Sequence, residues 1–487
     1  MAEQIHQHDI FLDKITIRGG AVPVDIKPMV KEVSIFESIW YPFLTGLVAI
    51  SDSHDLHGKL HNLSDTNTVD IKFGMTGLEG KGPDELIGVS PPPFHIVTET
   101  GRFKKTSGAE GYTLELVSES YRNAIDTRIS KTYKDMTISD MVKNIFKEHW
   151  GDATTDKDRK KVKLVLTETL TADTLTIPNL NPLEAILWLG GRAVDKEGGV
   201  NFTFFERMDG HYWASINHLL ANIDNDDETK GTIAKLVYKP SKVDDSTGLG
   251  HGKENIIVIK EFQIQKMANN QKKIKDGVYA SKMITHDITT KKIKETTYSL
   301  YEDWTKLNHC GAKTPTTNAE VETVAAGKPR QSFAPSTADS DKKTSKRLGD
   351  QVDTNIVYYP KHKQLHCATS TNDYDNNVEK WKLQRKGHTE IFTNTMQLTV
   401  EISGHSALRC GMVVWIEIPA SESTDGDKKT DRLYNTMFTG LWLITAIKHT
   451  IKGLGQAGES LGYHMIVEVT KDGIPDCFAE RPSRKEE

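Results

Sequence analysis

The sequence predicts a β-dominated α+β protein with two related β-barrel or β-sandwich units and α/β segments inserted between them. The main observation is a hairpin pattern that occurs twice, at residues 94–119 and 442–471. In each copy an alternating strand starts at an aromatic residue, enters a loop with Gly and Lys, and continues into a second alternating strand that begins with Gly-Tyr. The period of two gives each strand a core face and an outer face. The length of 487 residues indicates about three domains rather than one core.

The first β-domain is expected at residues 1–118. Segments 9–19, 29–52 and 69–74 are rich in β-branched and aromatic residues, as strands are. They precede the first hairpin and complete a barrel or sandwich with it. The aromatics Trp40, Tyr41 and Phe43 of the second segment are, on an alternating strand, more often core or subunit contacts than a ligand site.

An α/β insertion is expected at residues 119–232. Thr137 followed by Asp140 resembles a capping box, and apolar residues then recur at helical spacing up to Trp150. Asn181 and Pro182 announce a second helix as N-cap and first helical residue. The run 200–207 reads as a strand that ends in a turn at Asp209-Gly210.

Residues 233–385 form a strand-rich segment that joins the second barrel and carries a further insertion. Strands are expected at 256–267 and, as a pair, at 277–304. Residues 311–350 consist mainly of Thr, Ala, Ser, Pro, Lys and Gly, a composition that predicts a mobile loop or linker. Helical character follows at 376–395.

The second barrel is expected at residues 386–475, with a polar tail at 476–487. Its hairpin is predicted to be anchored in the same way as the first. The expected core anchors are Trp442, Ile444, Tyr463 and Ile466, with the counterparts Phe94, Ile96, Tyr112 and Leu114.

The composition excludes several classes of protein. A net charge of −5 gives no reason to expect nucleic-acid or membrane binding through bulk electrostatics. No apolar run approaches the roughly 20 residues of a membrane helix, and the first residues lack the features of a signal peptide, so the chain is expected to stay in the cytoplasm where it is made. Four widely spaced cysteines argue against a disulfide framework or a zinc ribbon.

No catalytic residue, cofactor or metal is assigned from the sequence. His54, His57 and His61 have a spacing that would place three rings on one helical face, but Gly58 weakens a helix there and a solvated turn is the preferred interpretation. The stretch 248–253 (GLGHGK) lacks the Ser or Thr of a phosphate loop and reads as a turn. Lysines at 271–275 and 291–294 form no continuous basic stripe and are expected to be solvated.

Several segments, taken in order, resemble a baseplate hub protein of contractile-tailed bacteriophages over nearly the whole chain. None is a sharp motif alone; their order and spacing are specific. The segments are FESIWYPFLTGLVAISDS (36–53), FHIVTET (94–100), GYTLELVSESYRNAIDTRISK (111–131), MTISDMVKNIF (136–146), IPNLNPLEAILWLGGRAV (177–194), VNFTFFERMDGHYW (200–213), GVYASKMITHDITTKK (277–292), LTVEISGHSALRCGMVVWIEIP (398–419) and the second hairpin.

The resemblance implies a trimer in which each subunit contributes two tail-tube-like β-barrel domains. Three subunits would form a pseudo-sixfold ring that adapts the hexameric tail tube to a trimeric spike and leaves a channel for genome ejection. The implied partners are the spike, tail tube or tube-initiator proteins, baseplate wedge proteins and the tape measure protein, with DNA passing without specific binding and no membrane contact. The implied location is the virion, after assembly in the host bacterial cytoplasm.

The same architecture occurs in the N-terminal part of type VI secretion spike proteins. Because this chain stops soon after the second barrel, the spike and any lysozyme are expected to be separate proteins. The alternative is a tail-associated, lysozyme-like cell-wall-degrading enzyme with its catalytic domain in 119–232 or 266–385. A hub is expected to clear no cell walls in a turbidity assay.

Overall fold

A computed structural model describes most of the chain between residues 10 and 472. None of the helices it describes is both long and apolar enough to cross a membrane. The described residues are 10–19, 23–53, 55–56, 67–76, 86–89, 91–104, 110–151, 163–170, 172–221, 234–238, 256–267, 270–288, 290–300, 303, 306–310, 355–360, 378–393, 395–405, 407–419, 435, 437–452 and 462–472.

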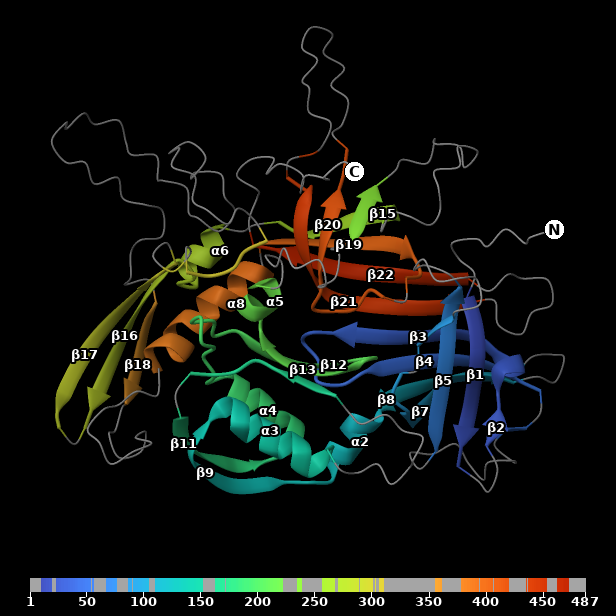
Figure 1. The fold of residues 1–487 in the computed structure, drawn as a ribbon, viewed down its shortest axis with the longest axis horizontal. Coiled ribbons are helices and arrows are strands. Elements are labelled where there is room, and N and C mark those ends of the chain that lie inside the picture. Colours follow the sequence, from blue (N-terminus) through green and yellow to red (C-terminus); the bar gives the residue numbers. More distant parts are fainter. Residues whose placement is uncertain are drawn as a thin grey trace, which may run out of the picture.

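Strands dominate the structure, and most of them belong to one 14-stranded sheet that passes through two barrels (Figure 1). The second barrel, here barrel two, is a closed ring of six strands in the order β21-β20-β14-β15-β19-β22, in which β22 returns to β21. These strands are β14 (Lys235–Tyr238), β15 (Ile256–Lys266), β19 (Met396–Ser403), β20 (Val413–Glu417), β21 (Gly440–Lys452) and β22 (Gly462–Lys471). This confirms the β-dominated fold with a β-barrel.

The first barrel, barrel one, has six strands in the order β3-β4-β8-β7-β5-β1. No described pairing joins β1 to β3, so this ring is open at that point. The strands are β1 (Ile10–Arg18), β3 (Val30–Ser38), β4 (Thr45–Asp52), β5 (Thr68–Thr76), β7 (Phe94–Lys104) and β8 (Glu110–Ser118), with the 3-10 turn η1 (Lys27–Met29) and the short strands β2 (Val24–Asp25) and β6 (Leu86–Val89) beside them.

The two barrels share the order of five strands and two bulges, whereas the sixth strands differ: β1 is antiparallel to β5, and β14 is parallel to β20. β7 and β21 both have a register shift three residues after the starting aromatic, between Ile96 and Thr98 and between Ile444 and Ala446. β3 and β15 also share a shift, one residue after Val30 in the first and one after Ile259 in the second. Because bulges bend a strand at a defined residue, β3, β4, β8, β7 and β5 correspond to β15, β19, β22, β21 and β20. The repeated hairpin is thus part of a larger repeat.

An α/β module packs below the barrels in the view of Figure 1. Its elements are α2 (Glu119–Ile125), β9 (Ile129–Thr137), α3 (Ile138–His149), β10 (Leu164–Leu166), β11 (Ala172–Leu180), α4 (Pro182–Gly190), β12 (Phe202–Arg207), β13 (Gly210–Ser215) and α5 (Ile216–Ala221). The predicted caps are confirmed: Thr137 accepts a hydrogen bond from Asp140 N, and Asn181 forms a capping box with Glu184.

A second insertion lies beside barrel two. Its three-stranded sheet has the order β17-β16-β18, and a helical segment packs against one face. The elements are α6 (Asn270–Lys275), β16 (Ala280–Asp287), β17 (Lys292–Ser299), β18 (Ile356–Pro360), the π-helix η4 (Glu379–Gln384) and α8 (Arg385–Thr393). The boundaries expected at 118, 232, 385 and 475 stay predictions; barrel two itself draws β14 and β15 from 235–266.

One hydrophobic core runs through both barrels, and a second fills the α/β module. Of the eight predicted anchors, seven are buried, but Ile466 is 40% exposed. The error has a simple cause: the inward face of β22 contains Tyr463, Met465 and Val467, so the residue between the last two points outward. Trp40 and Tyr41 lie in a turn rather than on a strand and are 37% and 63% exposed, so they are not core residues, and their role as subunit contacts stays a prediction. The expectation that Lys273 is solvated was wrong, since it is only 2% exposed.

Candidate functional site

The most distinctive site is the seam between the barrels, formed by β3 of barrel one and β21 of barrel two. The two strands pair in antiparallel fashion from Ser38 opposite Ala446 to Glu32 opposite Lys452. At its end the Lys452 ammonium lies 3.7 Å from the Glu32 carboxylate. The seam joins the two barrels in one continuous sheet.

Glu37 fastens this seam to the α/β module. It is 1% exposed and lies on the inward face of β3. One carboxylate oxygen accepts a hydrogen bond from the backbone N–H of Met208 at 3.1 Å, and the other accepts one from the backbone N–H of Cys410 at 3.3 Å. Met208 belongs to the β12–β13 turn and Cys410 precedes β20. One side chain therefore connects barrel one, the α/β module and barrel two.

Charged and aromatic groups surround Glu37. Its Oε1 lies 3.8 Å from Arg409 Nε and 4.0 Å from His449 Nε2. Burial raises the pKa of Glu37, an effect that Arg409 and the two backbone donors oppose. Burial, with a smaller contribution from Arg409, holds the pKa of His449 well below its usual value, so this ring is neutral. Its Nδ1 lies 2.7 Å from the hydroxyl of Tyr463, the aromatic of the repeated Gly-Tyr pair.

A second buried carboxylate, Glu206 of β12, connects the module to barrel one from the other side. Its Oε2 accepts hydrogen bonds from Leu44 N at 3.1 Å and from the Ser118 hydroxyl. Its Oε1 accepts a hydrogen bond from the Ser120 hydroxyl at 2.9 Å and lies 3.5 Å from His211 Nε2. Because each carboxylate holds backbone or hydroxyl groups of a different segment, the arrangement is suited to fixing orientation.

The arginine that follows Glu206 at the end of β12 completes the junction. Arg207 forms a bidentate ion pair with Asp209, with distances of 2.8 and 2.7 Å, and its guanidinium lies 4.1 Å from the ring centroid of Tyr212. The same guanidinium donates to the carbonyl oxygen of Cys410 at 3.4 Å. This is a second contact from the module to barrel two.

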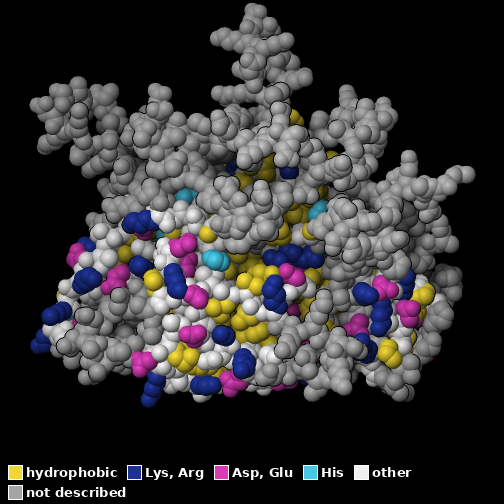
Figure 2. All heavy atoms as spheres, in the orientation of Figure 1, with side chains coloured by type: hydrophobic (Ala, Val, Ile, Leu, Met, Phe, Trp, Pro, Cys, Tyr) yellow, Lys and Arg dark blue, Asp and Glu magenta, His cyan; other side chains and the backbone are white. Residues whose placement is uncertain are grey.

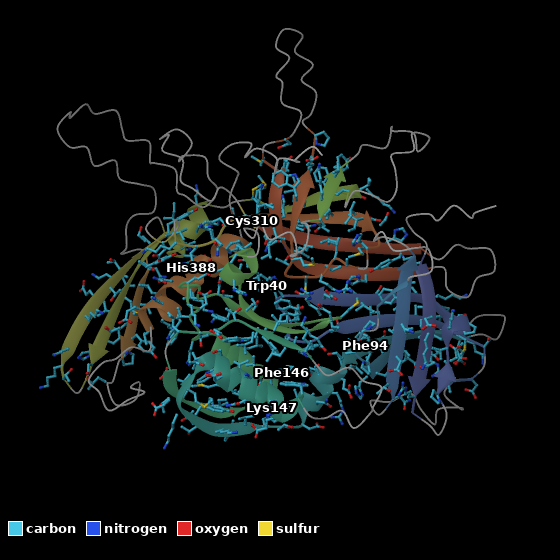
Figure 3. All side chains as sticks on the ribbon, in the orientation of Figure 1. Trp40, Phe94, Phe146, Lys147, Cys310 and His388 are labelled. Atoms are coloured by element: carbon cyan, nitrogen blue, oxygen red, sulfur yellow. The ribbon has the colours of Figure 1, made fainter. Side chains whose placement is uncertain are left out.

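A further buried polar cluster lies where β22 ends. The Asp472 carboxylate accepts hydrogen bonds from the His309 ring and, at 3.1 Å, from Cys310 N. Burial lowers the pKa of the neighbouring Lys471 to about 7, and its ammonium lies 4.5 Å from the ring centroid of Trp442. In Figure 3, Cys310 lies beside barrel two, and His388, a residue of α8, lies below and to the left of it. The cluster attaches the second insertion to barrel two.

His388 is the clearest acid-sensitive group in this cluster. It is 2% exposed, and neither ring nitrogen has a hydrogen-bond partner among the described residues. Burial lowers its pKa to about 4, an effect that Asp303 opposes and His309 reinforces. The unfolded chain therefore binds a proton that the folded chain does not between pH 6.5 and 4.

Stability is consequently expected to fall as the pH falls through this window. Replacing His388 with leucine should reduce the loss of unfolding free energy between pH 7 and 4.5 by roughly 2–3 kcal/mol. Urea unfolding at the two pH values measures it, with His95→Asn on β7 as the control. An equal pH dependence in parent and His388→Leu would contradict the assignment.

The structure places the residues singled out from the sequence in different ways. His54, His57, His61 and the stretch 248–253 lie outside the described residues, as does 311–350. Within the described part of the chain, no group of three or more His, Cys, Asp or Glu side chains is arranged to hold a metal. Trp40 lies near the junction of the barrels with β12 and β13 (Figure 3), and Phe43 packs on Tyr121 with ring centroids 4.4 Å apart.

The junction carboxylates were not predicted from the sequence, although one signal was present. Glu37 has the same strand phase as the buried Val33 and Ile35, and a carboxylate on an inward phase indicates a buried polar contact. Its partners could not be deduced, because Met208 and Cys410 are 171 and 373 residues away along the chain.

On the surface, Figure 2 shows positive and negative side chains interspersed among the described residues of the visible face.

Comparisons with known proteins rest on structure alone, since no family model and no curated protein matches the sequence. The fold is similar to a tail protein from Neisseria meningitidis, with TM-score 0.49, 10% identity, and 95% of this chain and 98% of that chain covered. It is similar to the 43 kDa tail protein of prophage MuSo2 from Shewanella oneidensis, with TM-score 0.45, 7% identity, and 94% and 99% covered. It is also similar to an E. coli component of the type VI secretion system, with TM-score 0.39, 9% identity, and 94% and 77% covered. The three solved structures are described as two tail proteins and a component of the type VI secretion system.

Proposed function

We propose that this chain is a structural virion protein that forms the trimeric central hub of a contractile phage tail baseplate. Three chains would present six similar barrels to a sixfold tail tube and a threefold face to a spike. A threefold object can make equivalent contacts with a sixfold tube only if each subunit carries two similar surfaces. The hub would act as a symmetry adapter and not as an enzyme.

One observation carries the proposal: a unit of five strands is repeated with two of its bulges in common, and the two copies are joined edge to edge through β3 and β21. Repeats that pack independently would need no shared sheet. A shared sheet sets the rotation between the barrels, as a ring of such units requires. The buried contacts of Glu37 and Glu206 support the same interpretation, because they hold this geometry instead of lining an open cleft.

The first test is the mass of the native assembly. Native mass spectrometry at micromolar concentration is expected to show a species of three times the 54.5-kDa chain mass. A two-dimensional average from electron microscopy is expected to show a ring with six similar lobes. A monomer alone, or a closed hexamer, would contradict the hub assignment.

The proposed partners follow the same logic. One face of the trimer would hold a trimeric spike and the other would contact tail tube or tube-initiator proteins, with baseplate wedge and tape measure proteins nearby. The loops at 101–110, 421–431 and 450–461 would supply docking contacts, since loops on a rigid scaffold carry specificity. Residues 105–109, 420–434 and 453–461 lie outside the described residues.

The channel of a hub is expected to release DNA and not to retain it. Each cation paired with a phosphate adds affinity through counterion release, and the chain carries a net charge of −5. Purified trimer is therefore expected to bind duplex DNA with Kd of about 10⁻⁴ M or weaker at physiological salt. Fluorescence anisotropy with a labelled duplex measures this, and submicromolar binding in 150 mM salt would contradict a passive channel.

A further inference from the structure

We infer that the outer edges of β7 and β15 pair with each other between neighbouring copies of this chain. β15 of one copy would lie antiparallel to β7 of the next, as β3 lies beside β21 within the chain. The partner is thus a second copy of the chain, and the inference rests on the proposed trimer. It adds to that proposal the strands and residues that form the subunit contact.

The starting point is how the seam uses β21. The first part of this strand, from Gly440 to Leu443, closes barrel two by pairing with β20. After the bulge, the same edge pairs with β3 from Ala446 to Lys452. One edge of one strand therefore serves two neighbours in turn: its own barrel, then the adjacent barrel.

In barrel one, the strand equivalent to β21 is β7. It pairs with a strand of its own barrel, β5, but no described strand of an adjacent barrel lies beside it. β7 pairs with β5 only at Phe94 and His95 and bulges at Val97. From Thr98 onward, the described part of the chain places no strand on the edge of β7 that faces away from β8. This is the stretch that corresponds to the seam part of β21.

In barrel two, the strand equivalent to β3 is β15, and part of one of its edges also has no described neighbour. β15 pairs with β14 only as far as Ile259, whereas its other edge pairs with β19 as far as Lys266. Beyond Ile259, no described strand lies on the first edge. Each barrel thus has one strand edge equivalent to that of β3 in the seam and one equivalent to that of β21. Among the described strands, β3 pairs with β21 within the chain, and no further strand lies on the corresponding edges of β15 and β7.

Such edges are normally short, charged or covered, because an open edge promotes association. Here both carry exposed apolar side chains: Val97 is 54% exposed, Ile264 is 43% exposed and Met267 is 46% exposed. Exposed apolar residues on two long edges with matching geometry fit a contact that is covered in the assembly. Because the contact joins different edges of the two copies, it is heterologous and can close into a ring.

The internal seam also predicts the register. In the seam, Lys448 lies opposite Phe36, and the Lys448 ammonium is 5.7 Å from that ring. The residue of β7 that corresponds to Lys448 is Thr100, because each lies six residues after the starting aromatic of its strand. β7 carries one extra residue between Thr100 and Phe103, where Gly101 has a φ of 66°, and β15 carries one between Ile264 and Lys266. Because the two extra residues lie at the same level, the strands stay aligned and Thr100 is placed opposite Lys266 of the neighbouring copy.

Cysteine pairs test this directly, because opposed Cα atoms in an antiparallel pair lie within disulfide range. Thr100→Cys with Lys266→Cys is expected to give covalently linked dimers and trimers on non-reducing gels after mild oxidation. The matched control is Phe36→Cys with Lys448→Cys, the same position in the internal seam, which should form a disulfide within one chain. Each single substitution and the unmodified chain show the background from the native cysteines.

The outcomes separate this inference from the hub proposal. Linked trimers from the Thr100–Lys266 pair, with a linked monomer from the control, support both. A native trimer that forms no linked species from this pair, nor from Thr100→Cys with Gln265→Cys or Met267→Cys, overturns the edge pairing and leaves the trimer standing. The absence of any trimer overturns both. Amide exchange provides a second readout: residues 98–104 and 260–266 should exchange more slowly in the trimer than in dilute monomer.

Discussion

Replacing Trp442 with alanine is expected to lower the free energy of unfolding by about 3–5 kcal/mol, the cost of removing a large aromatic from a packed core. Trp442 is 0% exposed at the start of β21, and its Nε1 donates to the Phe438 carbonyl oxygen at 2.9 Å. Its ring also covers the buried ammonium of Lys471, at 4.5 Å. Trp442→Ala would leave a cavity beside the Lys471 ammonium, whose positive charge is already disfavoured by burial.

Denaturant unfolding followed by far-UV circular dichroism measures this effect. Phe94→Ala, the equivalent change in barrel one, should give a loss of similar size, because Phe94 is also 0% exposed. The matched control is Ile466→Ala in the same hairpin as Trp442. That residue is 40% exposed, so its truncation should change stability by less than about 0.5 kcal/mol. An unchanged midpoint for Trp442→Ala would show that the strand does not anchor the barrel.

The second large effect is expected at Glu37. Glu37→Ala removes the acceptor of two buried backbone N–H groups, those of Met208 and Cys410, and leaves Arg409 without its nearest carboxylate. Removing one member of a buried ion pair costs about 3–5 kcal/mol, since the remaining groups stay desolvated. The loss should appear in the unfolding free energy and as faster proteolysis between the α/β module and the barrels.

Two further variants give this prediction its controls. Glu37→Gln retains one acceptor oxygen of similar geometry and should restore part of the lost stability. Glu32→Ala, on the same strand, removes the exposed ion pair with Lys452 and a hydrogen bond that the Ser34 hydroxyl donates at 3.2 Å, and should cost about 1 kcal/mol. If Glu37→Ala were as stable as Glu32→Ala, the junction would not depend on this carboxylate.

Local order was accessible from the sequence because it depends on residues close together along the chain. The caps at Thr137 and Asn181 involve partners three residues away, and the alternating pattern of each hairpin follows from the two-residue period of a strand. The repeated starting aromatic and the alternating strands were sufficient to indicate two copies of one β-unit, although the two Gly-Tyr pairs do not align: by the shared bulge, Tyr112 corresponds to Met465. The phase error at Ile466 arose because its own apolar side chain was followed instead of the phase of the strand, in which the polar residues His464 and Glu468 mark the outer face.

Tertiary structure alone decided how these units are joined. The pairing of β3 with β21 links residues more than 400 positions apart, and no local preference specifies such a partner. The burial of Glu37 and Lys273 likewise depends on segments distant in sequence that supply their acceptors or donors. The sequence by itself determined two amphipathic β-units and the helices between them, because periodicity and capping are local. The edges that meet, and the edges left for a neighbour, depend on the closed geometry of the whole sheet.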